Sequence, residues 1–149
     1  KNKEQHFGYK NHVKCNAKSK LIEKYSVSDA STHDSREIKG LIDEETDGRL
    51  HADSAYRSQE MDGYLKQRGI QNRINEKGYR GSPLSEKQKK NNRRKSKTRA
   101  RVEHIFGFQA QMRGDWIRTI GKSRAEFSIG LGNMEYNLFR YMQLGKSMT

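Results

Sequence analysis

The 149-residue chain carries 31 Lys and Arg against 18 Asp and Glu, a formal net charge of +13, and only 31% of its residues are hydrophobic. This length predicts one domain with a small core, and the apolar runs are far shorter than the roughly 20 residues of a membrane-spanning helix. The charge favours a polyanionic partner, DNA or RNA before a membrane surface. The single cysteine, Cys15, excludes an internal disulfide and has no zinc-binding spacing, so we expect a reducing, cytoplasmic compartment.

Two strands are expected first. Residues 7–15 alternate apolar and polar side chains from Phe7 to Cys15, residues 16–20 have turn chemistry, and residues 21–28 alternate again. Together they predict an antiparallel hairpin. The chain opens on Lys1, without Met or an apolar leader, which is typical of an internal or C-terminal piece of a longer protein.

A helix is expected next, in the segment STHDSREIKGLIDEE, where Ile38, Leu41 and Ile42 share one face. Asp34, followed by Glu37 three residues later, predicts a capping box at the start of this helix. The alternative role for Asp34 is that of a metal ligand, and the cap is the commoner use of a carboxylate at a helix start.

The segment GRLHADSAY predicts a short strand that ends at Asp53, just before a polar turn. A second helix is expected over residues 58–68, with Met61, Tyr64 and Leu65 facing inward, followed by a short strand over residues 70–76. The predicted order is thus strand, strand, helix, strand, helix, strand. A side chain at the tip of a strand, such as Asp53, is well placed to bind a ligand.

A long helix is expected from Ser85 to about Met112, ended by Arg113 and Gly114. Its first part, residues 85–101, holds nine Lys and Arg side chains and a single acid, Glu86. Such a run favours contact with a phosphate backbone, although a solvated, partly disordered linker is the alternative. A last helix over residues 122–142 repeats apolar side chains at steps of four and three, which predicts a core-facing stripe of Phe127, Leu131, Met134, Leu138 and Tyr141.

Glu103 stands out within the long helix. Val102, Ile105, Phe106 and Gln109 are predicted to form its buried face, with Arg99 and Glu103 in a second stripe at the edge of the core. If Asp53 and Glu103 converge, they offer hard oxygen ligands to Mg²⁺. An exposed ion pair between Arg99 and Glu103, one helical turn apart, explains the same residues without any metal.

Three segments in this order, HFGYKNHVKCNAKSKLIEKYSVSDASTHDS, HADSAYRS and KSKTRARVEHIFGF, resemble the C-terminal catalytic half of bacterial insertion-sequence DDE transposases. The resemblance spans nearly the whole chain. It implies an α/β, ribonuclease-H-like fold with a mixed sheet flanked by helices. It implies catalytic and metal-binding roles for Asp53, in an Asp-x-x-Tyr context with Tyr56, and for Glu103, four residues after Arg99. The chain departs from the family where a tyrosine and a lysine are common, with Ser96 and Ala110 at those positions.

The resemblance further implies Mg²⁺ (or Mn²⁺) as cofactor, with two ions in the complete site, and double-stranded DNA, both transposon ends and target, as the partner of a homodimer in a synaptic complex. Residues 1–149 would form part of one catalytic domain. The candidate DNA-binding residues are Arg94, Lys95, Lys97, Arg99, Arg101 and His104.

The family's first catalytic aspartate precedes the hairpin, and no Asp precedes Asp29 in this chain. We therefore expect the chain alone to be inactive, to lack the first strand of its sheet, and to be marginally stable or to associate through the edge so exposed. Two alternatives remain open: a related ribonuclease-H-like nuclease, and a non-catalytic basic module for DNA or RNA with Tyr79, Trp116 and His104 as stacking residues.

Overall fold

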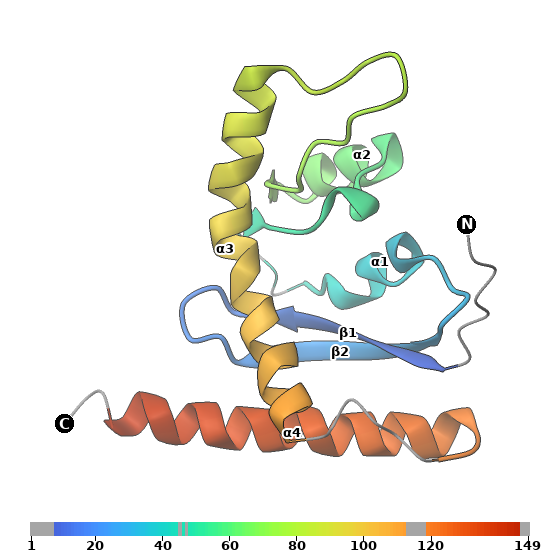
Figure 1. Ribbon diagram of the computed structural model, residues 1–149, viewed down its shortest axis with the longest axis vertical. Helices are drawn as coiled ribbons and strands as arrows, with labels where there is room; N and C mark the ends of the chain where they lie inside the picture. Colours follow the sequence, from blue (N-terminus) through green and yellow to red (C-terminus); the bar gives the residue numbers. More distant parts are fainter. Residues whose placement is uncertain (1–7, 45, 47, 113–118, 147–149) are drawn as a thin grey trace.

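The computed structural model describes residues 8–44, 46, 48–112 and 119–146. Its elements follow the predicted order, with a hairpin, two short parallel strands that alternate with two helices, and two long helices after them. Figure 1 shows the long helix α3 (Glu86–Gln111) running along one side of the molecule, from the region of α2 (Gln59–Gln67) down to α4 (Lys122–Lys146). The mixed α/β character expected from the sequence is confirmed. Within the described residues, no helix is both long and apolar enough to cross a bilayer.

The predicted hairpin is confirmed. Strand β1 (Tyr9–Cys15) pairs antiparallel with β2 (Ile22–Asp29), and Tyr9 lies opposite Asp29. The turn between them is built by Asn16, whose side-chain oxygen accepts the backbone N–H of Lys18 at 2.9 Å. Phe7, where the first strand was predicted to begin, lies outside the described residues.

The predicted cap at Asp34 is wrong. A short 3₁₀ turn (η1, Asp34–Arg36) precedes α1 (Ile38–Leu41), and the side chain that caps this turn is His33, which accepts the backbone N–H of Ser35. Asp34 binds the Lys10 ammonium instead, at 2.9 Å. A lysine on the neighbouring strand therefore takes the carboxylate that local spacing assigned to the helix.

Strands β3 (Arg49–Leu50) and β4 (Gln71–Asn72) pair in parallel, and α2 connects them with Ser58 as its N-cap. The Ser58 side chain accepts the backbone N–H of Met61, which satisfies one of the free donors at the helix start. This region, the aliphatic lobe (residues 34–76), has its own core. That core consists of Ile38, Ile42, Met61, Leu65, Ile70 and Ile74.

Helix α3 begins after Ser85, which forms a reciprocal capping box with Gln88, as the predicted start requires. On its predicted inner face Ile105 is fully buried, Val102 and Gln109 are half-buried, and Phe106 is 41% exposed. The predicted stop at residues 113 and 114 lies outside the described residues, as does Trp116.

Helix α4 packs on the hairpin with the face opposite to the one predicted. Its buried residues are Ala125, Ile129, Asn133 and Tyr136. Every member of the predicted core stripe, Phe127, Leu131, Met134, Leu138 and Tyr141, is exposed. The hairpin selects small and hydrogen-bonding side chains, because Asn133 bonds Asn11 at 2.8 Å and the Tyr136 hydroxyl donates to the Lys20 carbonyl at 3.0 Å. We call the hairpin, α4 and the C-terminal half of α3 the hairpin lobe.

Close approach of α4 to the hairpin also depends on Gly130. A Cβ atom at this position would lie 2.5 Å from the hydroxyl oxygen of Tyr25, closer than real contacts allow. A larger residue here would have to displace the Tyr25 side chain from α4.

The described strands form two two-stranded sheets rather than one mixed sheet. A cleft of about 1,050 Å³ is lined by residues of β1, by residues 48–53 on and after β3, and by residues of α1 and α3. The edge of β1 away from β2 and the edge of β3 away from β4 have no strand partner among the described residues. Only part of the expected single sheet is thus present.

Candidate functional site: two carboxylates on one arginine

Asp53 lies where the β3–β4 pairing ends. The parallel ladder continues past the two assigned strand residues, since the backbone N–H of Arg73 donates to the Leu50 carbonyl at 2.8 Å and that of Asn75 to Ala52 at 3.1 Å. Asp53 then precedes a short 3₁₀ turn (η2, Ser54–Tyr56) without capping it through its side chain. Its carboxylate accepts the neighbouring Ser54 hydroxyl at 3.1 Å and is 50% exposed. The strand-tip position predicted for Asp53 is therefore present.

Arg99 joins the two candidate carboxylates. Its guanidinium lies 3.6 Å from Asp53 Oδ2 through Nη1 and 2.9 Å from Glu103 Oε1 through Nη2. The ion pair expected within α3 is thus present, and Asp53 contacts the same cation. Arg99 Nε is buried and has no hydrogen-bond partner among the described residues, so the two carboxylates leave the guanidinium incompletely satisfied.

Glu103 reaches this position because it follows Arg99 by one helical turn on α3. Its side chain is 59% exposed, against 29% for Arg99. One half-exposed carboxylate therefore stands on each side of a mostly covered cation, and both remain accessible from solvent.

The cleft between the two sheets opens beside Asp53 and Arg99. Its lining also includes the cationic residues Lys14, Lys18 and Arg49. These three were not singled out in the sequence, because they lie on or beside strands far from the basic run, and no local pattern marks them. They line the same cleft as Asp53, and Lys14 is paired there with Asp43 at 3.0 Å.

The oxygen donors suit a hard divalent cation. Mg²⁺ is commonly held by one or two carboxylates, with water and substrate phosphates as the other ligands. Asp53 and Glu103 supply two such groups, exposed and already gathered by a positive charge. Within the described part of the chain, no three His, Cys, Asp or Glu side chains gather closely enough to hold a metal ion.

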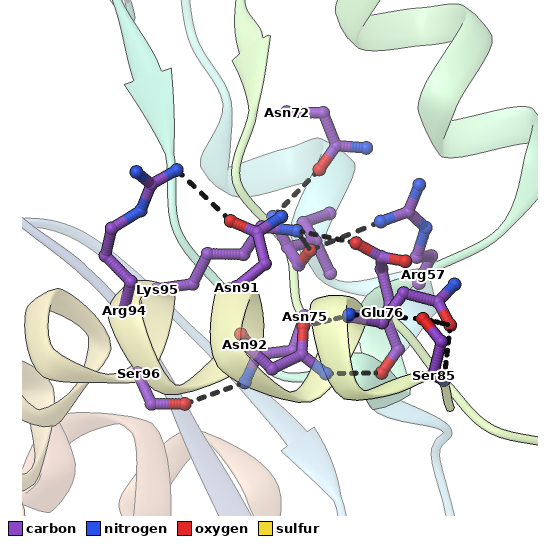
Figure 2. Close-up of polar contacts among 12 residues, drawn as sticks. Arg57, Asn72, Asn75, Glu76, Ser85, Asn91, Asn92, Arg94, Lys95 and Ser96 are labelled. Atoms are coloured by element: carbon purple, nitrogen blue, oxygen red, sulfur yellow. Dashed lines mark hydrogen bonds and ion pairs between the residues drawn. The ribbon is translucent and has the colours of Figure 1, made fainter. Parts of the chain in front are cut away.

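Lys95, one of the candidate DNA-binding residues, points into the protein. Its ammonium is buried, donates to the Ile74 carbonyl at 3.0 Å and lies 3.5 Å from the Glu76 carboxylate. Figure 2 shows it within a polar network between one face of α3 and residues 72–76. In this network Asn92 exchanges two hydrogen bonds of 2.9 Å with the Glu76 backbone, and Ser96 accepts from Asn75 at 3.0 Å.

Three other candidate cations of α3, Arg94, Lys97 and Arg101, are exposed at the surface, whereas Arg99 is mostly covered. Arg94 donates to Asn91 at 3.1 Å, and Arg101 reaches the Ala17 carbonyl of the hairpin turn. No hydrogen bond or ion pair is found for the exposed Lys97 ammonium among the described residues. These side chains are accessible to a polyanion.

His104 and Tyr56 have structural partners. The His104 ring meets Tyr136 edge-on, with centroids 6.1 Å apart, and partial burial lowers the pKa of His104, with Lys20 and Arg140 acting in the same direction. Tyr56 packs against the core of the aliphatic lobe, and burial raises its pKa, followed by the charges of Asp34 and Asp53.

Two comparisons with known proteins identify relatives. Residues 1–138 match the family described as "Transposase DDE domain". The chain is 37% identical over 101 residues to the transposase for insertion sequence element IS1106 of Neisseria meningitidis serogroup B, a match that covers 67% of this chain and 35% of that protein. The matched region thus spans about a third of this curated relative. No solved structure matches the chain.

Proposed function

The chain belongs to the DDE transposase family, and from that premise we propose that it forms part of a catalytic domain that cleaves and joins DNA strands with Mg²⁺ (or Mn²⁺). In this proposal Asp53 and Glu103 are the metal ligands and catalytic residues. The observation that carries it is the pair of contacts from Arg99 to both carboxylates, which lie far apart in the sequence. All 149 residues would contribute to one domain, acting in the cytoplasm on the bacterial nucleoid.

The residues of the site have different proposed roles, which follow from the chemistry of their side chains. Asp53 and Glu103 provide hard oxygen ligands, and bound divalent ions, two in the complete site, would activate a water or 3′-hydroxyl and stabilise the leaving oxygen. Arg99 contacts both carboxylates, and its guanidinium would become available to a DNA phosphate where bound ions replace it on them. Tyr56 anchors the turn that follows Asp53 to the aliphatic core.

Double-stranded DNA, at transposon ends and target, is the proposed substrate. The exposed Arg94, Lys97 and Arg101 would hold its backbone without reading its sequence, and His104 would lie beside it. Lys95 has an internal role by its contacts, so we leave it out of the proposed DNA surface. Two copies of the parent protein would act together as a homodimer in a synaptic complex.

We also propose that the fold is ribonuclease-H-like and that the cleft between the two sheets receives the family's first strand, with the remaining catalytic aspartate. The free strand edges of β1 and β3 and the apolar side chains of Ile38, Ile42 and Val102 in the cleft lining support this. The chain by itself would then hold two of three carboxylates and be inactive. Mg²⁺-dependent strand cleavage by the purified chain, lost in Asp53→Ala, would contradict this expectation.

The metal site is tested by titrating Mg²⁺ or Mn²⁺ into the chain while following backbone and carboxylate NMR signals, with and without a DNA duplex. We expect metal-dependent changes at Asp53, Arg99 and Glu103 that disappear in Asp53→Asn and in Glu103→Gln. Both replacements retain the side-chain shape and remove the charge.

Glu126 provides the matched control, because it is a half-buried carboxylate in a helical i,i+4 ion pair with Lys122 at 3.7 Å, away from the cleft. Glu126→Gln should leave the metal response unchanged. DNA binding without any response from Asp53 or Glu103 would instead favour a non-catalytic basic module.

A further inference from the structure

The outer face of α4 is apolar and uncovered by the other described elements. Phe127, Leu131, Met134, Leu138 and Tyr141 are between 46% and 71% exposed, although they recur at helical steps of four and three. We call these five residues the α4 seam. Large apolar side chains in one contiguous stripe are unusual on a monomeric surface and mark an interaction site.

The inner face of the same helix already has its partners. Asn137 bonds both backbone groups of Ile22, at 2.8 and 2.9 Å, and the Tyr136 ring packs edge-on against Phe108 of α3. Figure 1 shows α4 at one margin of the molecule, with the hairpin along one side of it. The seam is therefore not the unfilled half of an internal contact.

We propose that the α4 seam is the surface on which a second copy of this chain docks, helix against helix. Apolar residues that alternate at steps of four and three form the a and d positions of a heptad repeat, whose natural partner is a helix with the same repeat. A second copy supplies that helix, and a two-fold dimer brings the same patch of both molecules together. This proposal names the surface through which the homodimer of the proposed function would form. It rests on the proposed function only for the requirement that two copies of the chain act together.

The size of the seam matches what a stable dimer needs. A large side chain has roughly 200 Å² of accessible area. Multiplied by the exposed fractions of the five seam residues and of Met142, which is 62% exposed, this gives ~700 Å² of exposed surface per copy. A standard protein interface buries about 800 Å² per partner. The seam with its immediate rim is thus sufficient.

The charge distribution favours a second copy over DNA or a lipid surface. Between Phe127 and Met142 the sequence contains two charged residues of opposite sign, Glu135 and Arg140, in a chain of net charge +13. Arg140 is turned towards the hairpin, where its Nε donates to the Ser19 carbonyl at 2.8 Å. Both DNA and an anionic membrane would require Lys or Arg beside the apolar residues. Two basic molecules can meet at this face without strong repulsion.

A groove next to the seam can receive side chains of the partner helix. Its volume is about 450 Å³, and it lies between β2 and α4. Its lining includes Leu21 and Tyr25 from the hairpin side and Met134, Leu138 and Tyr141 from the seam. Side chains of a facing helix would therefore find a hole on the side of the seam that faces β2.

The first test measures the mass of the 149-residue chain by sedimentation equilibrium over a wide concentration range, without DNA or divalent metal. We expect a reversible monomer–dimer equilibrium, weakened at least about 30-fold by Leu138→Glu, since a charge then replaces a central interface side chain. Gln67→Glu adds the same charge at an exposed position of α2 and should leave the dimer unchanged. A chain that stays monomeric, or a Leu138→Glu variant that dimerises equally well, would overturn the proposal.

The second test locates the contact. Met134 is the middle residue of the seam, so Met134→Cys should give a covalent dimer with a short bismaleimide in either helix orientation. The unchanged chain, with Cys15 alone, and Gln67→Cys are the controls and should remain uncrosslinked. This test retains its force if Leu138→Glu fails to fold, which circular dichroism would reveal.

The other candidate occupant is a further segment of the longer parent protein. A monomeric parent in which hydrogen exchange of α4 is slowed relative to the 149-residue chain would assign the seam to that segment and overturn docking of a second copy. Because neither test contains DNA or metal, its failure is distinguishable from failure of the metal titration.

Discussion

The aliphatic lobe and the hairpin lobe are held together by different chemistry. The first has a core of six aliphatic side chains drawn from α1, α2 and the segments beside β4. In the second, the buried cluster is smaller, Ile22, Ile105 and Tyr136, and asparagine side chains make many of the contacts between the hairpin and α4. Aliphatic side chains can pack with small displacements of one helix against another, whereas hydrogen bonds between amides hold the hairpin and α4 in one register. The candidate site lies where these two kinds of structure meet along α3.

The largest effect is expected in the core of the aliphatic lobe. Leu65 is fully buried, and Leu65→Ala should lower the free energy of unfolding by about 2–5 kcal/mol, through lost apolar burial and the cavity left behind. Chemical denaturation followed by circular dichroism measures this change. Gln67→Ala, two residues away and exposed, should alter stability by less than about 0.5 kcal/mol. Equal effects of the two substitutions would mean that this core contributes little.

The junction between α3 and the aliphatic lobe is tested by two lysines of the same helix. Lys95→Met removes a buried charged hydrogen bond and should cost about 1.5–3 kcal/mol of stability. Lys97→Met, at an exposed position, should leave stability nearly unchanged.

DNA binding should be affected by the exposed lysine, Lys97, and not by the buried lysine, Lys95. Lys97→Met is expected to reduce the salt dependence of affinity by about one counterion, whereas Lys95→Met leaves it unchanged in the folded protein. Fluorescence anisotropy with a labelled duplex at several salt concentrations measures both. Reversed roles would return Lys95 to the DNA surface.

A smaller loss is expected where the hairpin lobe depends on amides. Asn133→Ala leaves the side-chain amides of Asn11 and Gln109 without their shared acceptor, at a cost of about 1–2 kcal/mol. A double-mutant cycle with Asn11→Ala isolates the pair, because energies of residues in direct contact do not add. Simple additivity of the two single changes would show that the amide contact is not energetically coupled.

The smallest effect is a dependence on pH in the hairpin. Burial lowers the pKa of His12 below its usual 6.5, opposed by the charges of Asp34 and Glu37 and aided by Lys10. Because the unfolded chain then binds the proton more readily, stability should fall as the pH drops below about 6.5, by no more than about 1.4 kcal/mol per pH unit from this group. His12→Gln should flatten that part of the profile in pH-dependent denaturation. An unchanged slope would assign the effect to other groups.

The hairpin, the two lobe helices and the start of α3 could all be predicted, since alternation, apolar spacing and caps such as Ser58 and Ser85 are local signals. The orientation of α4 could not be predicted, because the periodicity identifies an apolar face of the helix but not the element against which that face packs. The hairpin offers amide and carbonyl groups, which select Asn133 and Asn137. Apolar residues at steps of four and three are expected both for a stripe that packs in the core and for an exposed seam such as that of α4.

The candidate site was predictable in part. The spacing of Arg99 and Glu103 predicts their ion pair, whereas the contact of Arg99 with Asp53 depends on how α3 seats on the aliphatic lobe. Lys95 was indistinguishable from its exposed neighbours, because a run of cations does not reveal which one meets the Ile74 carbonyl.

Helix α3 is 26 residues long and packs against both lobes. Its length therefore affects whether the candidate site or the lobes are disrupted first on heating. Asp53 belongs to the aliphatic lobe and Glu103 to a helix that also packs in the hairpin lobe, so their contacts with the same Arg99 depend on how the polar network around Glu76 holds α3 against the aliphatic lobe. A rotation of α3 by one residue, about 100°, would carry Glu103 to another face of the helix. Local loosening of that network would therefore separate the two carboxylates at a temperature at which both lobes are still folded.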